Sequence, residues 1–209
     1  MRIAIPVHDG VDLLDVAGPL EMFSWVQGPI TLETVVISAD GGPVTSLNGL
    51  KFHAHRGFDD PGEIDVLWVP GHDPDVLSTL MTGPDTRYLD FLRATAASAA
   101  YVCSVCEGAL LLAQAGLLDG FAATTHWMFV NCLKRFPAIR VDESNPRFVH
   151  DRNRLTGGGI SSGLDEALKL IELLAGEQAA RDAQLATQYF PDPPVRGSIP
   201  AAPVCPVQF

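Results

Sequence analysis

The chain has 209 residues, 47% of them hydrophobic and 19% charged, so it is long enough to bury a sizeable core and too apolar to be disordered. Its 14 Lys and Arg against 25 Asp and Glu give a net charge of −11. That charge disfavours nucleic acids and anionic membranes as partners, because both are bound through basic surfaces. No apolar run approaches the ~20 residues that cross a bilayer. We therefore expect a small-molecule partner.

Cysteine usage and the start of the chain bear on the compartment. The sequence opens directly on a strand-like segment, residues 2–7, without the basic and apolar regions of a signal peptide. Four cysteines are too few for a disulfide scaffold. We therefore expect a cytoplasmic protein in which all the cysteines are free thiols, with Cys132 placed in the core and Cys205 in the C-terminal tail.

Short apolar runs alternate with helical patterns along the chain. Strands are predicted at residues 3–7, 31–37, 66–69 and 101–105 and around Leu155. Helices are predicted at 19–25 with Pro19 in the first turn, at 86–100, at 109–118, from 127 to about 136, and at 164–175 with Leu164, Leu168, Ile171 and Ala175 on one face. This alternation predicts an α/β fold, a doubly wound, mostly parallel sheet with helices on both faces, as in a flavodoxin-like sandwich.

The last 19 residues differ from the rest in composition. Six of the 16 prolines lie in residues 191–209, which excludes helix or central strand there. We therefore predict one domain over residues 1–190 and a proline-rich tail over 191–209. The tail has two open interpretations: an extended segment on the surface, or an arm that packs on a partner subunit.

Chemically versatile residues follow the predicted strands. In a doubly wound sheet, sites form outside the carboxyl ends of the strands. That edge is expected to collect Asp15 after the first strand, Gly71 and His72 after 66–69, Cys106 and Glu107 after 101–105, and Gly159 and Ile160 in the glycine-rich segment 157–162.

Cys106 is the most informative of these residues. It follows a buried strand and directly precedes a helix, which predicts the sharp turn of a nucleophile elbow with strained backbone at the cysteine. The adjacent helix N-terminus is expected to favour the reactive thiolate. The alternative is a buried core cysteine, which is the commoner role of a free cysteine.

Other candidate groups are less specific. Cys103 and Cys106 form a CxxC, but Cys103 lies inside the strand, which disfavours a thioredoxin-like or zinc site, and we expect no metal. His126 precedes the predicted helix at 127–136 and is interpreted either as a cap residue or as a partner of Cys106. His72 is either a pocket wall or simply exposed.

Four segments carry a resemblance to a known family. They are LDVAGPLE at 14–21, VPG at 69–71, VCEGA at 105–109 and ATTHW at 123–127. Together they resemble the ThiJ/PfpI superfamily, which has a class I glutamine amidotransferase-like fold, and the resemblance runs from Met1 to about Ala186. Within it the segments look like the isonitrile (isocyanide) hydratase branch, and similar segments occur in the ligand-sensing half of some AraC-type regulators.

The resemblance implies roles for individual residues. Cys106 matches the nucleophile and Asp15 the essential acid of the hydratases. Gly71 and Glu107 match positions whose backbone N–H groups face the nucleophile. Glu107 is also a departure, since the hydratases have a small polar residue after the cysteine. Its carboxylate would raise the pKa of the thiol if it points inward, or interact with the helix dipole if it points to water.

The leading hypothesis is therefore hydration of an isonitrile to an N-substituted formamide by a homodimer that needs no cofactor. A second hypothesis is glyoxalase-like or amidase chemistry on a small carbonyl compound with Cys106, His126 and Glu107. A third is a ligand or redox sensor without enzymatic activity. An AraC-type regulator would continue into a helix-turn-helix domain, which the proline-rich segment before Phe209 disfavours.

Overall fold

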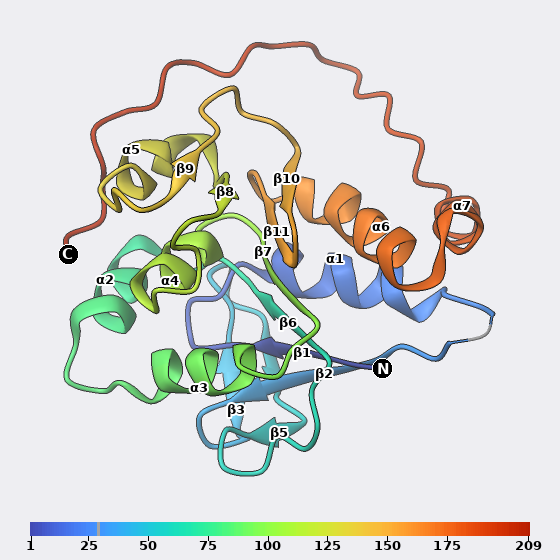
Figure 1. The fold of residues 1–209 in the computed structure, drawn as a ribbon, viewed down its shortest axis with the longest axis horizontal. Helices are drawn as coiled ribbons and strands as arrows, with labels where there is room; N and C mark the ends of the chain where they lie inside the picture. Colours follow the sequence, from blue (N-terminus) through green and yellow to red (C-terminus); the bar gives the residue numbers. More distant parts are fainter. Residues whose placement is uncertain (29) are drawn as a thin grey trace.

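The computed structural model describes residues 1–28 and 30–209, and a seven-stranded sheet forms its centre (Figure 1). The strand order is β10-β11-β7-β6-β1-β2-β5, and every neighbouring pair is parallel except β10 and β11. The bounds of these strands are β1 Arg2–Pro6, β2 Glu33–Ser38, β5 Arg56–Gly57, β6 Val66–Val69, β7 Tyr101–Ser104, β10 Phe148–Asp151 and β11 Arg154–Gly157. The predicted doubly wound, mostly parallel sheet is confirmed.

Helices cover both faces of the sheet, as expected from its buried strands. One face is covered by α1 Leu13–Ser24, α6 Ser162–Ala175 and α7 Glu177–Ala186, and the other by α2 Pro74–Thr82, α3 Arg87–Ala96, α4 Gly108–Gln114 and α5 Val130–Leu133 (Figure 1). Helix α4 is almost completely buried, as its apolar sequence predicts. An added Cβ at Gly108 would lie 2.0 Å from the carbonyl oxygen of Val69, so the first residue of α4 is in close contact with the end of β6.

Several predicted helices have different bounds. Helix α1 begins at Leu13, after the N-cap residue Asp12, so Pro19 lies inside the helix and not in its first turn. The helix predicted at 127–136 is a 3-10 turn over Trp127–Phe129 followed by α5, which ends at Leu133. The structure also contains two small pairs, the hairpin of β3 Pro43–Thr45 with β4 Lys51–His53, and the parallel pair of β8 Ala122–Ala123 with β9 Arg140–Val141.

The register of α6 also differs from the prediction. Its fully buried positions are Ser162, Gly163, Glu166, Ala167, Leu170 and Ile171, whereas Leu164, Leu168 and Ala175 are only half-buried. The predicted apolar face was therefore offset around the helix. Gly163 allows this register, because its missing side chain lets α6 approach Val105 and Trp68. The offset brings an acidic residue, Glu166, into the core.

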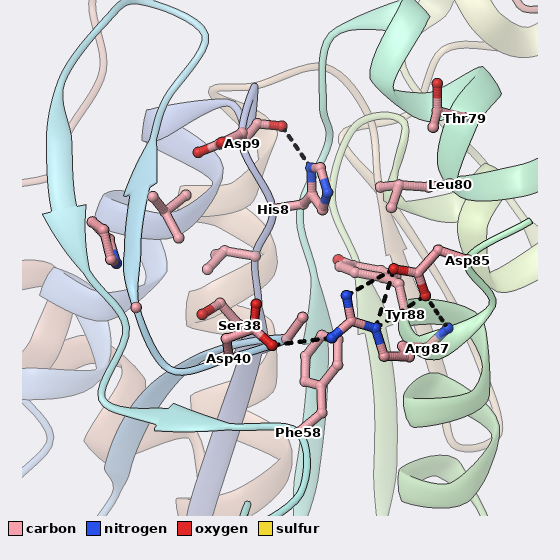
Figure 2. A pocket seen from close by; sticks show the side chains of 15 residues that line it. His8, Asp9, Ser38, Asp40, Phe58, Thr79, Leu80, Asp85, Arg87 and Tyr88 are labelled. Atoms are coloured by element: carbon pink, nitrogen blue, oxygen red, sulfur yellow. Dashed lines mark hydrogen bonds and ion pairs between the residues drawn. The ribbon is translucent and has the colours of Figure 1, made fainter. Parts of the chain in front are cut away.

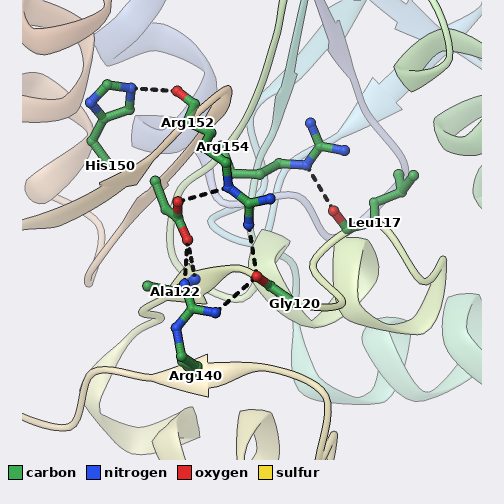
Figure 3. Close-up of polar contacts among 8 residues, drawn as sticks. Leu117, Gly120, Ala122, Arg140, His150, Arg152 and Arg154 are labelled. Atoms are coloured by element: carbon green, nitrogen blue, oxygen red, sulfur yellow. Dashed lines mark hydrogen bonds and ion pairs between the residues drawn. The ribbon is translucent and has the colours of Figure 1, made fainter.

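Arginine side chains connect the β10–β11 turn by hydrogen bonds and ion pairs to the segment after α4 and to β8 (Figure 3). Arg140 and Arg152 both donate to the carbonyl of Gly120, at 2.9 and 2.7 Å, and both pair with Asp151. Asp151 also accepts the N–H of Ala122 at 2.7 Å. Arg154 donates to the carbonyl of Leu117 at 2.7 Å. These charge-assisted bonds hold the antiparallel edge of the sheet at the end opposite the glycine-rich segment.

The C-terminal tail crosses the surface as an extended chain from α7 to α5 (Figure 1). Cys205 forms a disulfide with Cys132, which precedes it by 73 residues, so the expectation that both are free thiols is wrong. The expectation failed because a pairing over that distance leaves no spacing pattern in the sequence. Cys103 and Cys106 are free and buried. In the part of the chain that the structure describes, no helix is long and apolar enough to cross a membrane.

Candidate functional site

Cys106 occupies a strained turn between β7 and α4. Its φ is 56°, in the left-handed region that side chains rarely adopt, as the predicted elbow requires. Its N–H donates to the carbonyl of Gly158 at 2.9 Å, and its carbonyl accepts the hydroxyl of Thr125 at 2.8 Å. Both peptide groups of the turn are therefore held by neighbouring segments. The side chain is 1% exposed.

Asp15 is placed by the first turns of α1 after β1. Pro19 has no N–H, so the carbonyl of Asp15, four residues earlier, has no partner within the helix. That carbonyl instead accepts the indole N–H of Trp68 on β6 at 3.1 Å. The side-chain Oδ2 accepts the N–H of Gly71 at 2.8 Å. Pro19 thus leaves the Asp15 carbonyl free to accept the Trp68 N–H, and this hydrogen bond holds Asp15 next to β6.

The thiol and two carboxyls form one buried cluster. Side-chain ligand atoms of Asp15, Cys106 and Glu107 all lie within 4.8 Å of one another, and Asp15 is 0% and Glu107 8% exposed. One sulfur and two oxygens at this spacing could contribute three ligands to a metal ion, one fewer than a structural zinc site uses. The same three groups could also exchange protons, which is the use that their protonation states favour.

Burial determines these protonation states. It raises the pKa of Asp15 well above its usual range, negative charges on Asp12 and Glu107 raise that pKa further, and the Gly71 N–H opposes them. Burial also raises the pKa of Glu107 to about 7, although its contact with the thiol acts in the opposite direction. The pKa of the Cys106 thiol is raised well above its usual range by burial and by the two carboxyls, while the Ile160 N–H lowers it.

These contacts bear on three expectations about the site. The thiolate was expected to be favoured by the α4 N-terminus, but burial and the two neighbouring acids raise the pKa of the thiol and so favour its neutral form. Glu107 points inward and not to water, since an added Cβ at Gly71 would lie 2.3 Å from its Oε2. The N–H of Gly71, expected to face the nucleophile, is taken by Asp15. The backbone group that faces the sulfur is the N–H of Ile160.

The glycine-rich segment opens a pocket beside the cluster. This pocket has a volume of about 350 Å³, and Gly159, Ile160 and His126 are among its lining residues. The Nδ1 of His126 accepts the N–H of Met128 at 3.3 Å, and the ring lies against Gly159, so this histidine is a cap residue and a pocket wall. The cap interpretation of His126 is the one that fits these contacts.

His72 follows Gly71 in the chain but is not among the residues that line the pocket beside Ile160. It is 2% exposed, its ring meets Tyr88 edge-on at 5.8 Å, and burial lowers its pKa to about 3. Tyr88 in turn lines a second pocket of about 290 Å³ at the ends of β1 and β2, where Arg87 pairs with Asp40 and Asp85 (Figure 2). His72 is therefore neither exposed nor a wall of the pocket beside Ile160.

Sequence reasoning missed Glu166, which lies behind the cluster. It is 0% exposed, and neither carboxyl oxygen makes a hydrogen bond of normal geometry among the described residues, although the Ser104 N–H is near enough to lower its pKa slightly. The carboxyl occupies the space left by the missing side chain of Gly157, next to Ser104 on β7. Burial raises its pKa well above the usual range, and the charge of Asp15 adds to this. The available signal in the sequence was its spacing, because Glu166 lies four residues before Leu170 and therefore on the same face of α6.

Comparison with known proteins agrees with this geometry. The DJ-1/PfpI family model matches residues 1–173. The chain belongs to the DJ-1/PfpI family. It is 39% identical over 200 residues to an isonitrile hydratase of Pseudomonas putida, covering 96% of this chain and 83% of that protein. A crystal structure of a THiJ/PfpI family protein from Pseudomonas syringae superposes with a TM-score of 0.85 at 36% identity, covering 97% of this chain and 81% of that one.

Regulators also contain this domain. The HTH-type transcriptional regulator GbdR of Pseudomonas aeruginosa is 30% identical over 162 residues, which cover 77% of this chain but 42% of the regulator. The family membership that the sequence motifs predicted is thus confirmed. Since the family contains proteins of different function, the reaction has to be argued from the site itself.

Proposed function

We propose that the protein hydrates an isonitrile to an N-substituted formamide, with Cys106 as nucleophile and Asp15 as the acid and base. The observation that carries this proposal is the buried cluster in which the Cys106 thiol lies beside the carboxyls of Asp15 and Glu107, both of raised pKa. An isonitrile carbon carries a lone pair and becomes a good electrophile only when it gains a proton. A buried carboxylic acid beside a thiol is suited to supply that proton.

In the first step the S–H bond of Cys106 is added across the isonitrile carbon. Asp15 gives its proton to that carbon as the sulfur attacks it, and the thiol proton passes to the Asp15 carboxylate that this leaves. The product is a thioimidate, R–N=CH–S–Cys106, in which the carbon–sulfur bond is new. The N–H of Ile160 faces the sulfur and stabilises negative charge that develops there during the attack.

In the second step water replaces the sulfur. Asp15 protonates the thioimidate nitrogen and, now ionised, takes a proton from a water molecule that attacks the carbon, which gives the adduct R–NH–CH(OH)–S–Cys106. The adduct expels the sulfur, which takes the proton held by Asp15, and the hydroxyl proton passes to Asp15 as the product R–NH–CHO forms. The sum is R–NC plus H2O giving a formamide, with both side chains restored. Bond making and breaking balance with no oxidant and no organic cofactor.

The test is turnover of cyclohexyl isonitrile followed by formamide formation. Cys106→Ala and Asp15→Asn are each expected to lower kcat by at least ~10³-fold, because each removes a group that contacts the reacting carbon. Glu63→Gln, a change at an exposed carboxyl far along the chain from the cluster, is the matched control. Circular dichroism establishes that each variant is folded. Formamide production by folded Cys106→Ala at the wild-type rate would refute the mechanism.

The proposal also covers the oligomeric state, the compartment and the partners of the protein. We propose a homodimer that acts on a small molecule, without nucleic acid or membrane, in the cytoplasm, where the Cys132–Cys205 disulfide is subject to reduction. The 14 basic residues against 25 acidic ones support the absence of polyanionic partners. Light scattering on the eluting peak of a sizing column gives the mass, and a monomer at micromolar concentration would contradict the dimer.

A further inference from the structure

The end of the C-terminal tail is built into the domain. Besides the disulfide to Cys132, Asn131 donates to the carbonyls of Ala202 and Pro203 at 3.1 and 2.8 Å. Val207 is 2% exposed and lies in the apolar core beneath α2 and α5. Phe209 stacks on Phe136 with ring centroids 5.3 Å apart. These contacts fix the path of the residues that precede them.

That path brings Ile199 to the pocket beside Cys106. Ile199 lines the pocket of about 350 Å³ together with Leu14 and Ile160. All three aliphatic side chains are exposed, at 54%, 41% and 37%, an arrangement that is unfavourable unless something apolar covers them. They come from three separate segments, namely the tail, the start of α1 and the glycine-rich turn.

The pocket adjoins the reacting groups through two of its lining residues, Ile160 and Leu14. Ile160 contributes its side chain to the pocket and its N–H to the sulfur of Cys106, and Leu14 is the neighbour of Asp15. A substrate whose carbon reaches Cys106 would therefore leave its remaining atoms against these aliphatic side chains. The occupant that this wall fits is an apolar substituent, such as the R group of an isonitrile.

We propose that Ile199 is a specificity-determining residue of the substrate pocket, held in place by the Cys132–Cys205 disulfide. The proposal rests on the function proposed above and deepens it. The tail forms the outer wall for bulky apolar R groups. Reduction by a dithiol converts the disulfide to two thiols while the dithiol becomes a disulfide, and this releases residues 191–204 from their covalent anchor. Selectivity between large and small substrates is then redox-dependent.

The experiment measures kcat/KM for cyclohexyl and for methyl isonitrile and compares the ratio of the two. Ile199→Ala is expected to lower this ratio about tenfold, since one lost aliphatic contact in an apolar pocket changes discrimination by roughly 10–200-fold. Cys132→Ser with Cys205→Ser is expected to lower it in the same direction, as is wild type treated with a dithiol. Val204→Ala, whose side chain is 90% exposed and outside the pocket, is the matched control. A ratio in Ile199→Ala equal to that of wild type would overturn the proposal.

A second readout separates this proposal from the function on which it rests. Alkylation of Cys106 by N-cyclohexylmaleimide and by N-methylmaleimide is followed by peptide mass spectrometry. If wild type turned over neither isonitrile, the proposed function would fail. The wall would still be supported by an alkylation rate ratio that falls in Ile199→Ala and stays unchanged in Val204→Ala. An unchanged ratio in both variants would refute it independently of turnover.

Discussion

Glu107→Gln tests the electrostatics of the site through the stability of the whole protein. The carboxyl of Glu107 has its pKa raised from 4.5 to about 7 by burial. The folded protein therefore holds this proton more tightly than the unfolded chain does. Unfolding releases it between pH 4.5 and 7, so stability due to this group is present below pH 4.5 and is lost as the pH rises through 7. A shift of this size corresponds to about 3 kcal/mol at pH 8.

Glutamine cannot ionise, so the variant does not lose this part of its stability as the pH rises. The free energy of unfolding of Glu107→Gln, relative to wild type, is expected to rise by about 3 kcal/mol between pH 4.5 and pH 8. Urea unfolding of both proteins at half-unit pH intervals, with the disulfide kept oxidised, gives this difference. The titration of Glu166 enters both proteins and largely cancels, whereas the pKa of Asp15 is lower in the variant because the charge of Glu107 is gone. Glu63→Gln, at an exposed position, is expected to follow wild type. Parallel curves for wild type and Glu107→Gln would refute the inward, protonated placement of Glu107.

Three further substitutions test the packing around the cluster. Gly71→Ala places a Cβ 2.3 Å from Glu107 Oε2 and 3.0 Å from Cys106 Cβ. Because this displaces the reacting groups, kcat/KM for an isonitrile is expected to fall at least ~10-fold in a folded protein. A wild-type rate would show that the side chains of the cluster can move aside without loss of activity. Gly108→Ala directs a Cβ at the Val69 carbonyl, which cannot move away. The substitution is expected to lower Tm by ~10 °C or more in a thermal melt. A much smaller decrease in Tm would contradict the close approach of α4 to β6. Glu166→Met removes an unpartnered buried acid and is expected to raise the free energy of unfolding at pH 8 by ~1–3 kcal/mol in urea, whereas destabilisation would mean that the carboxyl is satisfied in the folded protein.

Local patterns were enough to predict the sheet and the elbow. The strand at 66–69 coincides with β6, and the immediate succession of strand, Cys106 and helix left no room for any connection except a strained turn. These features follow from residues adjacent in sequence. The rule that sites form at the carboxyl ends of parallel strands brought Asp15 and Cys106 to one edge of the sheet, and the family resemblance gave Asp15 its role as the acid.

Features that depend on tertiary contacts were not predictable in this way. Pro19 is tolerated inside α1 because the carbonyl it frees accepts the Trp68 indole N–H, a partner contributed by another element. The register of α6 depends on Gly163 lying against Val105 and Trp68, and Glu166 is buried as a consequence. The disulfide requires the tail to return to α5 after crossing the surface. In each case the deciding partner lies more than 40 residues away in the sequence.

The protonation state of the cluster also discriminates between the two enzymatic hypotheses. Amidase or glyoxalase-like chemistry begins with attack of a thiolate on a carbonyl, and that requires a thiol of lowered pKa or an imidazole that takes its proton. Here the pKa of the Cys106 thiol is raised, and the Nδ1 of His126 accepts the backbone N–H of Met128. An isonitrile differs from a carbonyl compound because its carbon must be protonated for attack to succeed. Two acids with raised pKa values beside a neutral thiol therefore favour the substrate that needs a proton first, and Glu107 strengthens that preference.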